Sequence, residues 1–213
     1  ARRRTWREPN AWQRRAHALG EYLAQQLGYP ANIVPEKTDL LMKQPDYRGM
    51  QRHNTLGIAF PGIAKHVLER FGSKAVTYDL EVPAGRIFPG ISIPGRSVTP
   101  RIDLLATREN IPRVIITSKW SVRHDRVNDI TNECPAYKAA YNRIYRQVRQ
   151  EPLLYYVLTN EYDPSRLNKM LDDSCVDGVV HVHKTAVVEV CQLDDRLRRL
   201  LDLLDLINET VNW

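Results

Sequence analysis

The sequence predicts an α/β fold in which helices flank a mixed β-sheet, and three observations lead to it. Residues 101–107 and 113–119 are apolar runs with period-two alternation, and the short loop between them predicts an antiparallel hairpin. Residues 153–159 are almost continuously apolar, as expected of a strand that is covered on both faces. Helices alternate with such strands in the second half of the chain, which is typical of an α/β core.

The other elements follow from periodicity and from stop signals. Asn10 can cap a helix over residues 11–27, which Gly28 ends, and residues 30–54 and 83–95 contain too many breakers for regular structure. The remaining predicted helices cover residues 61–71, 132–149, 164–171 and 193–207, and the remaining predicted strands cover residues 75–82 and 178–182.

The composition is that of a globular protein with a substantial core. Of 213 residues, 43% are hydrophobic and 26% charged, and we expect a cytoplasmic protein because neither a membrane span nor a signal peptide is evident. Lys and Arg number 31 against 25 Asp and Glu, and the net charge of +6 favours an anionic partner. Cys134, Cys175 and Cys191 are widely spaced, so we expect free thiols rather than a disulfide framework or a zinc cluster.

A candidate site lies at the open end of the predicted hairpin. Alternation along its strands places Asp103 roughly opposite Thr117 and one step from Lys119, and Glu133 at the start of the next predicted helix can reach the same face. Carboxylates that hold Mg²⁺ beside a lysine are a common means of hydrolysing a phosphodiester. On these residues alone, an ordinary ion pair between Asp103 and Lys119 is just as good an interpretation.

Two further side-chain groups have simpler interpretations. His181 and His183 share a strand face, but no third metal ligand accompanies them, so we expect packing or exposure at a strand end. Trp120 is assigned to the core beneath the segment that follows Lys119.

The spacing of the candidate residues resembles the PD-(D/E)xK nuclease superfamily, and within it the type II restriction endonucleases that recognise CCGG. In that branch a small residue stands two positions before the lysine, and a glutamate on the following helix, with 13 residues between it and the lysine, supplies the missing carboxylate. Thr117, Lys119 and Glu133 reproduce this pattern. The resemblance implies a restriction-endonuclease-like core in which Asp103 and Glu133 bind Mg²⁺ and Lys119 orients the attacking water.

The same branch carries an Arg-x-Asp-Arg signature directly after the lysine, and residues 123–126 match it. By this resemblance Arg123, Asp125 and Arg126 read the CCGG core. The chemistry agrees, because an arginine fork fits guanine and a carboxylate accepts from the amino group of cytosine. A solvated charged loop is the alternative.

Two weaker matches extend the resemblance, which covers roughly residues 60–185. Glu69 is the plausible equivalent of a helical glutamate that assists at the metal site, and Arg166 resembles an arginine that contacts bases flanking the core. Two features depart from the pattern: Ile102 replaces the usual proline before Asp103, and the gap from Asp103 to Lys119 is short, as in the related CCNGG/CCWGG branch.

The expected protein is therefore a prokaryotic type II restriction endonuclease of a restriction-modification system. It would cut double-stranded DNA before the CC of a palindrome containing CCGG and leave 5′ overhangs. It would act as a homodimer, and both a dimer and a tetramer made of two dimers are open as its final assembly. We expect one domain, with residues 1–55 contacting DNA or a partner subunit, 60–185 forming the catalytic core and 190–213 a C-terminal helix. The alternatives are a CCNGG/CCWGG enzyme, a non-cleaving DNA-binding module, a structure-selective repair nuclease and a basic interaction domain without DNA.

Overall fold

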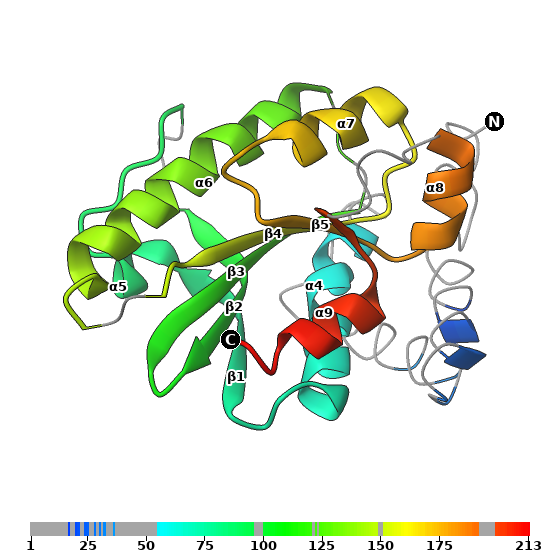
Figure 1. The fold of residues 1–213 in the computed structure, drawn as a ribbon, viewed down its shortest axis with the longest axis horizontal. Helices are drawn as coiled ribbons and strands as arrows, with labels where there is room; N and C mark the ends of the chain where they lie inside the picture. Colours follow the sequence, from blue (N-terminus) through cyan, green and yellow to red (C-terminus); the bar gives the residue numbers. More distant parts are fainter. Residues whose placement is uncertain are drawn as a thin grey trace. The chain divides into compact units, whose positions relative to one another are not determined.

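The computed structural model separates into two compact units, residues 1–64 and 65–213 (Figure 1). It describes residues 17, 20–21, 24–25, 28, 30, 32, 36, 55–95, 100–120, 122, 124–148, 151–191 and 199–213, without the side chains of 55–59, 124–127 and 190. No helix among these residues has the length and apolar character that a membrane span requires.

The first unit contains what is described of the predicted N-terminal helix. The described residues between 17 and 25 are helical, and Gly28 ends the helix with φ of 62° while its N–H donates to the carbonyl of Ala24 at 3.0 Å. The predicted loop 43–54 lies outside the described residues. Helix α4 (Thr55–Phe71) begins in this unit rather than at Pro61, which lies inside the helix instead of in its first turn.

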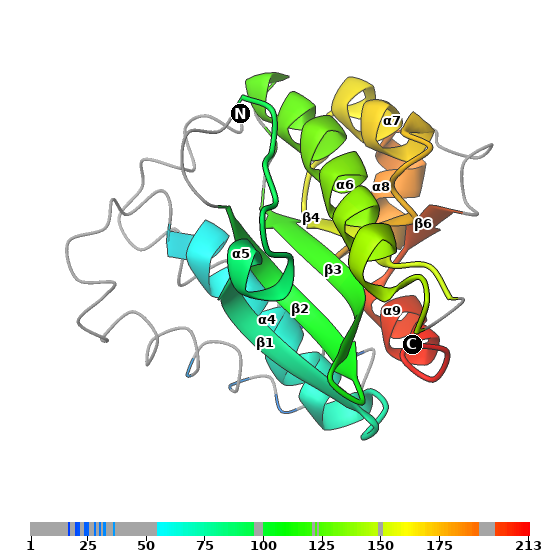
Figure 2. The ribbon, with the colours of Figure 1, turned by 90° about the vertical axis from the view of Figure 1, so that its left-hand side faces the viewer.

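The second unit is built on a six-stranded sheet with the strand order β1-β2-β3-β4-β5-β6. The first three strands form an antiparallel meander and the last three continue it in parallel, so the predicted mixed sheet is confirmed (Figure 2). The strands are β1 (Val76–Pro83), β2 (Arg101–Arg108), β3 (Ile111–Lys119), β4 (Leu154–Thr159), β5 (Gly178–His181) and β6 (Leu200–Leu201).

The hairpin between β2 and β3 is tighter than predicted. Its two turn residues, Glu109 and Asn110, have φ of 53° and 63°, the positive values that two-residue hairpins favour. Leu104 pairs with Ile116 beyond a register shift at residues 106–107. This register carries Asp103 opposite Thr117, as the alternation predicted.

Helices cover both faces of the sheet (Figures 1 and 2). Helix α6 (His124–Tyr145) buries Tyr137 in one core together with Ile115 and Tyr155 from the sheet. On the other face, after α9 (Leu203–Glu209), the ring of Trp213 packs against Tyr78 and Tyr156. The remaining helices are α5 (Ala84–Ile87), α7 (Pro164–Asp172) and α8 (Lys184–Cys191).

Two predicted helices have different bounds in the structure. Helix α6 begins at His124 instead of residue 132, so Pro135 lies inside it and Glu133 is in its middle rather than at its start. The predicted helix 193–207 is confirmed over residues 203–207, which belong to α9, but it is wrong at Leu200–Leu201, which form β6. Asp202 separates them because its side chain accepts from the N–H of Asp205 in a capping box.

The expectation that all cysteines are free thiols is also wrong. Cys134 of α6 and Cys175, in the connection between α7 and β5, form a disulfide whose Cα atoms lie 6.0 Å apart, while Cys191 is buried and lies outside the disulfide. Sequence spacing gave no hint of this pair because its members are 41 residues apart and meet only when α6 packs beside α7.

Candidate active site

Asp103 lies on β2 beside the C-terminal end of β3, and three donors from β3 converge on its Oδ2 atom. They are the backbone N–H of Ser118 at 2.7 Å, Oγ1 of Thr117 at 3.2 Å and Nζ of Lys119 at 3.4 Å. The side chains of Asp103 and Lys119 are 23% and 18% exposed, so the pair is shielded but still reachable from solvent. All three of these donors contact Oδ2, and among the described residues none is found at Oδ1.

Glu133 reaches this group through Tyr155 of β4. The buried Tyr155 hydroxyl donates to Oε2 of Glu133 at 3.2 Å. Burial raises the pKa of Tyr155 well above its usual value, the charges of Glu133 and Asp103 raise it further, and a hydrogen bond with Thr117 lowers it. The two carboxylates therefore both act on one neutral hydroxyl, and the structure brings together Asp103, Lys119 and Glu133 as predicted.

Glu81 of β1 is a third carboxylate near Asp103, and sequence reasoning missed it. The strand pairs Leu80–Leu104 and Val82–Ile102 flank it and place it across from Asp103. Its φ of 52° is unusual for a residue other than glycine inside a strand. Burial raises the pKa of Glu81 and the charge of Asp103 raises it further, against the lowering effects of Arg101 and Lys119.

The predicted assistant Glu69 is not part of this group. Glu69 precedes β1, whose first residue Val76 pairs with Arg108 at the end of β2 remote from Asp103. Five residues of extended strand separate that end from Asp103, which is roughly 17 Å. The Glu69 side chain is 49% exposed and lies 3.4 Å from Nζ of Lys65. A glutamate in the last turn of α4 therefore belongs to the opposite end of the sheet.

The residues predicted to read bases are described only in part. Arg123 lies outside the described residues, and Asp125 and Arg126 belong to the first turn of α6, where their side chains are not described. Arg166, in the first turn of α7, is described: its Nη1 atom lies 3.2 Å from Oε2 of Glu161. Its base-reading role and those of the other three residues stay predictions.

Glu161 is a further residue whose part sequence reasoning missed. Its side chain is only 4% exposed, and four groups in the described part of the chain donate to it. The donors are the backbone N–H groups of Val122, Tyr162 and Asp163 and the guanidinium of Arg166. Backbone donors leave no mark in a sequence, so only the structure could reveal this arrangement.

His181 is a packed core histidine, as expected. Its Nδ1 atom accepts from the N–H of His183 at 3.0 Å, so its Nε2 atom carries the proton and donates to the carbonyl of Glu161 at 2.9 Å. Burial lowers the pKa of His181 to about 4 and keeps the ring neutral. Trp120 is 8% exposed, in agreement with its assignment to the core.

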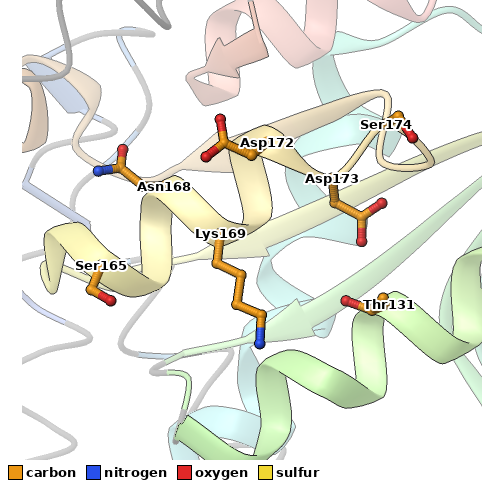
Figure 3. A pocket seen from close by; sticks show the side chains of 7 residues that line it. All are labelled: Thr131, Ser165, Asn168, Lys169, Asp172, Asp173 and Ser174. Atoms are coloured by element: carbon orange, nitrogen blue, oxygen red, sulfur yellow. The ribbon is translucent and has the colours of Figure 1, made fainter.

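A polar groove of about 690 Å³ lies between α6 and α7, away from these residues. Lys169 extends across it from α7 and donates to Asn128 of α6 at 2.8 Å (Figure 3). Its lining residues are Thr131, Ser165, Asn168, Lys169, Asp172, Asp173 and Ser174. The lining combines one lysine with two aspartates, and none of the predicted site residues is part of it.

The fit of a metal ion depends on the two carboxylates. Within the part of the chain that the structure describes, no three His, Cys, Asp or Glu side chains gather into a group that could hold a metal by themselves. Mg²⁺, however, is usually bound by one or two carboxylates together with water and substrate phosphates. Asp103 and Glu133, both close to Tyr155, fit such a site when a phosphate supplies the remaining oxygens.

Comparisons with known proteins give a likeness in structure but none in sequence. No protein-family model matches the sequence, and no curated protein matches it. Among solved structures, the chain is similar to the type IIF restriction endonuclease Bse634I, crystallised with cognate DNA. The identity is 10%, the TM-score is 0.45, and the likeness covers 87% of this chain and 85% of that chain.

Proposed function

We propose that this protein is a Mg²⁺-dependent endonuclease that hydrolyses double-stranded DNA at a specific site, in the manner of a type II restriction enzyme. The observation that carries the proposal is the convergence of Thr117, Ser118 and Lys119 on one oxygen of Asp103 at the C-terminal edge of β3. An ordinary surface ion pair has no need of a backbone N–H and a hydroxyl on the same oxygen, nor of a buried glutamate nearby.

Each residue would have a distinct part in the reaction. Asp103 and Glu133 would hold Mg²⁺, which when bound neutralises phosphate charge and favours ionisation of the attacking water. Lys119 would orient that water and counter the charge that develops on the phosphate. The donors on Oδ2 of Asp103 would fix the carboxylate so that Oδ1 faces the metal. The Tyr155 hydroxyl would orient the Glu133 carboxylate.

The recognition sequence is proposed from the Arg-x-Asp-Arg signature. Arg123, Asp125 and Arg126 would contact the CCGG core of a palindrome, and Arg166 a flanking base. Reading a palindrome implies a two-fold homodimer with one active site for each strand. A CCNGG or CCWGG site is the second candidate, favoured by the short gap between Asp103 and Lys119.

The test is a digest of DNA of known sequence with Mg²⁺, followed by sequencing of the fragment ends. Discrete fragments with 5′ overhangs before CC are expected, and Lys119→Ala should lower the rate roughly 10²- to 10⁴-fold. Lys184→Ala is the matched control because Lys184 pairs with Asp205 at 2.7 Å on the far helices α8 and α9.

Other results would select the alternatives. Unchanged cleavage by Lys119→Ala would overturn the assignment of the site. A smear would indicate a structure-selective nuclease, and binding without cleavage in saturating Mg²⁺ would indicate a DNA-binding module. A chain without salt-sensitive affinity for DNA would be an interaction domain of another kind.

A further inference from the structure

One carboxylate oxygen joins two segments that the proposed function uses separately. Oε2 of Glu161 accepts from the N–H of Val122 at 2.9 Å and from Nη1 of Arg166 at 3.2 Å. Val122 stands three residues after Lys119, and Arg166 lies in the first turn of α7. The same oxygen is therefore bonded both to the end of the segment that carries the catalytic lysine and to the predicted base reader.

Hydrogen bonds join the described residues of the segment that begins at Lys119 to the segment that follows β4. Thr159 donates from Oγ1 to the carbonyl of Lys119 at 2.7 Å, and the N–H of Asn160 donates to the carbonyl of Trp120 at 3.1 Å. The bond from Val122 to Glu161 is the next in this series. A shift of Glu161 would consequently be passed to the backbone that positions Lys119.

The other carboxylate oxygen of Glu161 fixes the side chain against the residues that follow it. Oε1 accepts from the N–H groups of Tyr162 and Asp163, each at 2.9 Å, and the carbonyl of Glu161 accepts from His181. A carboxylate that is 4% exposed cannot exchange these partners for water without a large cost. Glu161 thus moves together with the start of α7, and with Arg166, rather than independently of them.

We propose that Glu161 is a positioning residue that couples contact between Arg166 and DNA to the placement of Lys119. This inference rests on the proposed function, and it adds to it a route by which base contact in the flanking sequence controls the rate of cleavage. Glu161 itself touches neither DNA nor the water. Its effect is on the rate of the bound complex, because a small misplacement of a catalytic group costs rate rather than affinity.

The experiment measures binding and single-turnover cleavage separately, with the full-length chain and a CCGG duplex at saturation. Glu161→Gln puts an amide N–H₂ where donors converge, so it should lower the saturated rate roughly 100-fold and change the affinity for duplex less than threefold. Arg166→Ala alone should lower the cleavage rate. When it is added to Glu161→Gln, it should cause no further loss of rate. Additive losses would overturn the coupling.

Asp163→Asn is the matched control. Asp163 caps α7 by accepting from the N–H of Arg166 at 3.2 Å, and its carboxylate lies 4.0 Å from the guanidinium. This substitution removes a neighbouring charge from Arg166 but leaves the bonds of Glu161 to Val122 and Arg166 intact, so the rate should stay within about threefold of the wild type. A loss equal to that of Glu161→Gln would reduce Glu161 to a structural residue.

A second measurement does not depend on cleavage. Amide hydrogen exchange of residues 119–122 should slow when the wild-type chain binds duplex DNA, and Arg166→Ala should abolish that slowing while leaving the three backbone bonds of Glu161 in place. This exchange measurement needs only the wild type and Arg166→Ala, so it can be made even if Glu161→Gln does not fold. Equal protection in wild type and Arg166→Ala would overturn the inference alone, whereas a wild-type chain that neither binds nor cuts duplex DNA would overturn the proposed function as well.

Discussion

The Tyr155 hydroxyl donates to Oε2 of Glu133 at 3.2 Å inside the core, and this bond connects strand β4 to the carboxylate on helix α6. A tyrosine whose pKa is raised well above its usual value, by burial first and then by nearby carboxylates, stays protonated at neutral pH and so remains a donor. The orientation of the Glu133 carboxylate therefore depends on a side chain of the sheet as well as on its own helix.

Tyr155→Phe should therefore lower the apparent affinity of the protein for Mg²⁺. We expect half-maximal cleavage at a Mg²⁺ concentration about tenfold higher, because residues that orient a metal-binding side chain commonly contribute 10- to 100-fold. Tyr156→Phe is the control, since Tyr156 is equally buried but packs against Trp213 on the other face. Cleavage rates over a Mg²⁺ titration decide the matter, and equal behaviour of the two variants would contradict this role.

Glu81→Gln should stabilise the protein near pH 7. Burial and Asp103 raise the pKa of Glu81, so its ionised form is disfavoured in the folded state, and this cost disappears as the pH falls below the ordinary value of 4.5. The gain should be under about 1 kcal/mol because the side chain is half exposed and screened. Urea unfolding at pH 7 and pH 4 measures it.

Glu109→Gln is the control for this substitution. Glu109 shares a positive φ with Glu81 but lies in the hairpin turn at the other end of β2. If Glu81→Gln raises the free energy of unfolding at pH 7 and Glu109→Gln does not, the gain comes from relieving repulsion between Glu81 and the carboxylate of Asp103. The same gain at both pH values would show that charge is not its cause.

The Cys134–Cys175 disulfide should contribute substantially to stability. It closes a loop of 41 residues, for which chain entropy gives about 4 kcal/mol, and it ties α6, at the residue next to Glu133, to the connection between α7 and β5. Reductant and Cys134→Ser should lower the free energy of unfolding by similar amounts, and reductant should not affect the variant further. Cys191→Ser, at the cysteine outside the disulfide, should keep the response to reductant. Thermal unfolding with and without reductant is the measurement, and an unresponsive wild type would exclude the disulfide.

The candidate site was predictable where local rules act. Period-two alternation in β2 and β3 was sufficient to place Asp103 opposite Thr117 and near Lys119, because a buried sheet fixes its register strongly. The role of Glu133 stays a prediction, and α6, which carries it, begins eight residues earlier than periodicity suggested. A proline is tolerated best in a first turn, so Pro135 pointed to a later start than the structure has.

What escaped prediction depends on contacts between distant segments. Glu81 joins the carboxylates through a positive φ that its residue type does not favour, and Glu161 is held by backbone N–H groups. The leucines near the C-terminus fit a helix and a strand equally well, and the cap at Asp202 decides between them. Glu69 fitted a motif, but the direction of α4 takes it to the remote end of the sheet.

The stability of the protein should fall in mild acid because of His181. Burial lowers its pKa from 6.5 to about 4, so between these values the unfolded chain binds a proton that the folded chain does not. The stability is fully present above pH 6.5 and is lost as the pH falls, by about 3 kcal/mol at pH 4. Urea unfolding from pH 8 to pH 4 should show this slope in the wild type. His181→Gln, which does not titrate, should reduce it, whereas His183→Gln at an exposed position should keep it. If His181→Gln shows the same slope of stability against pH as the wild type, His181 is not the cause of the acid sensitivity.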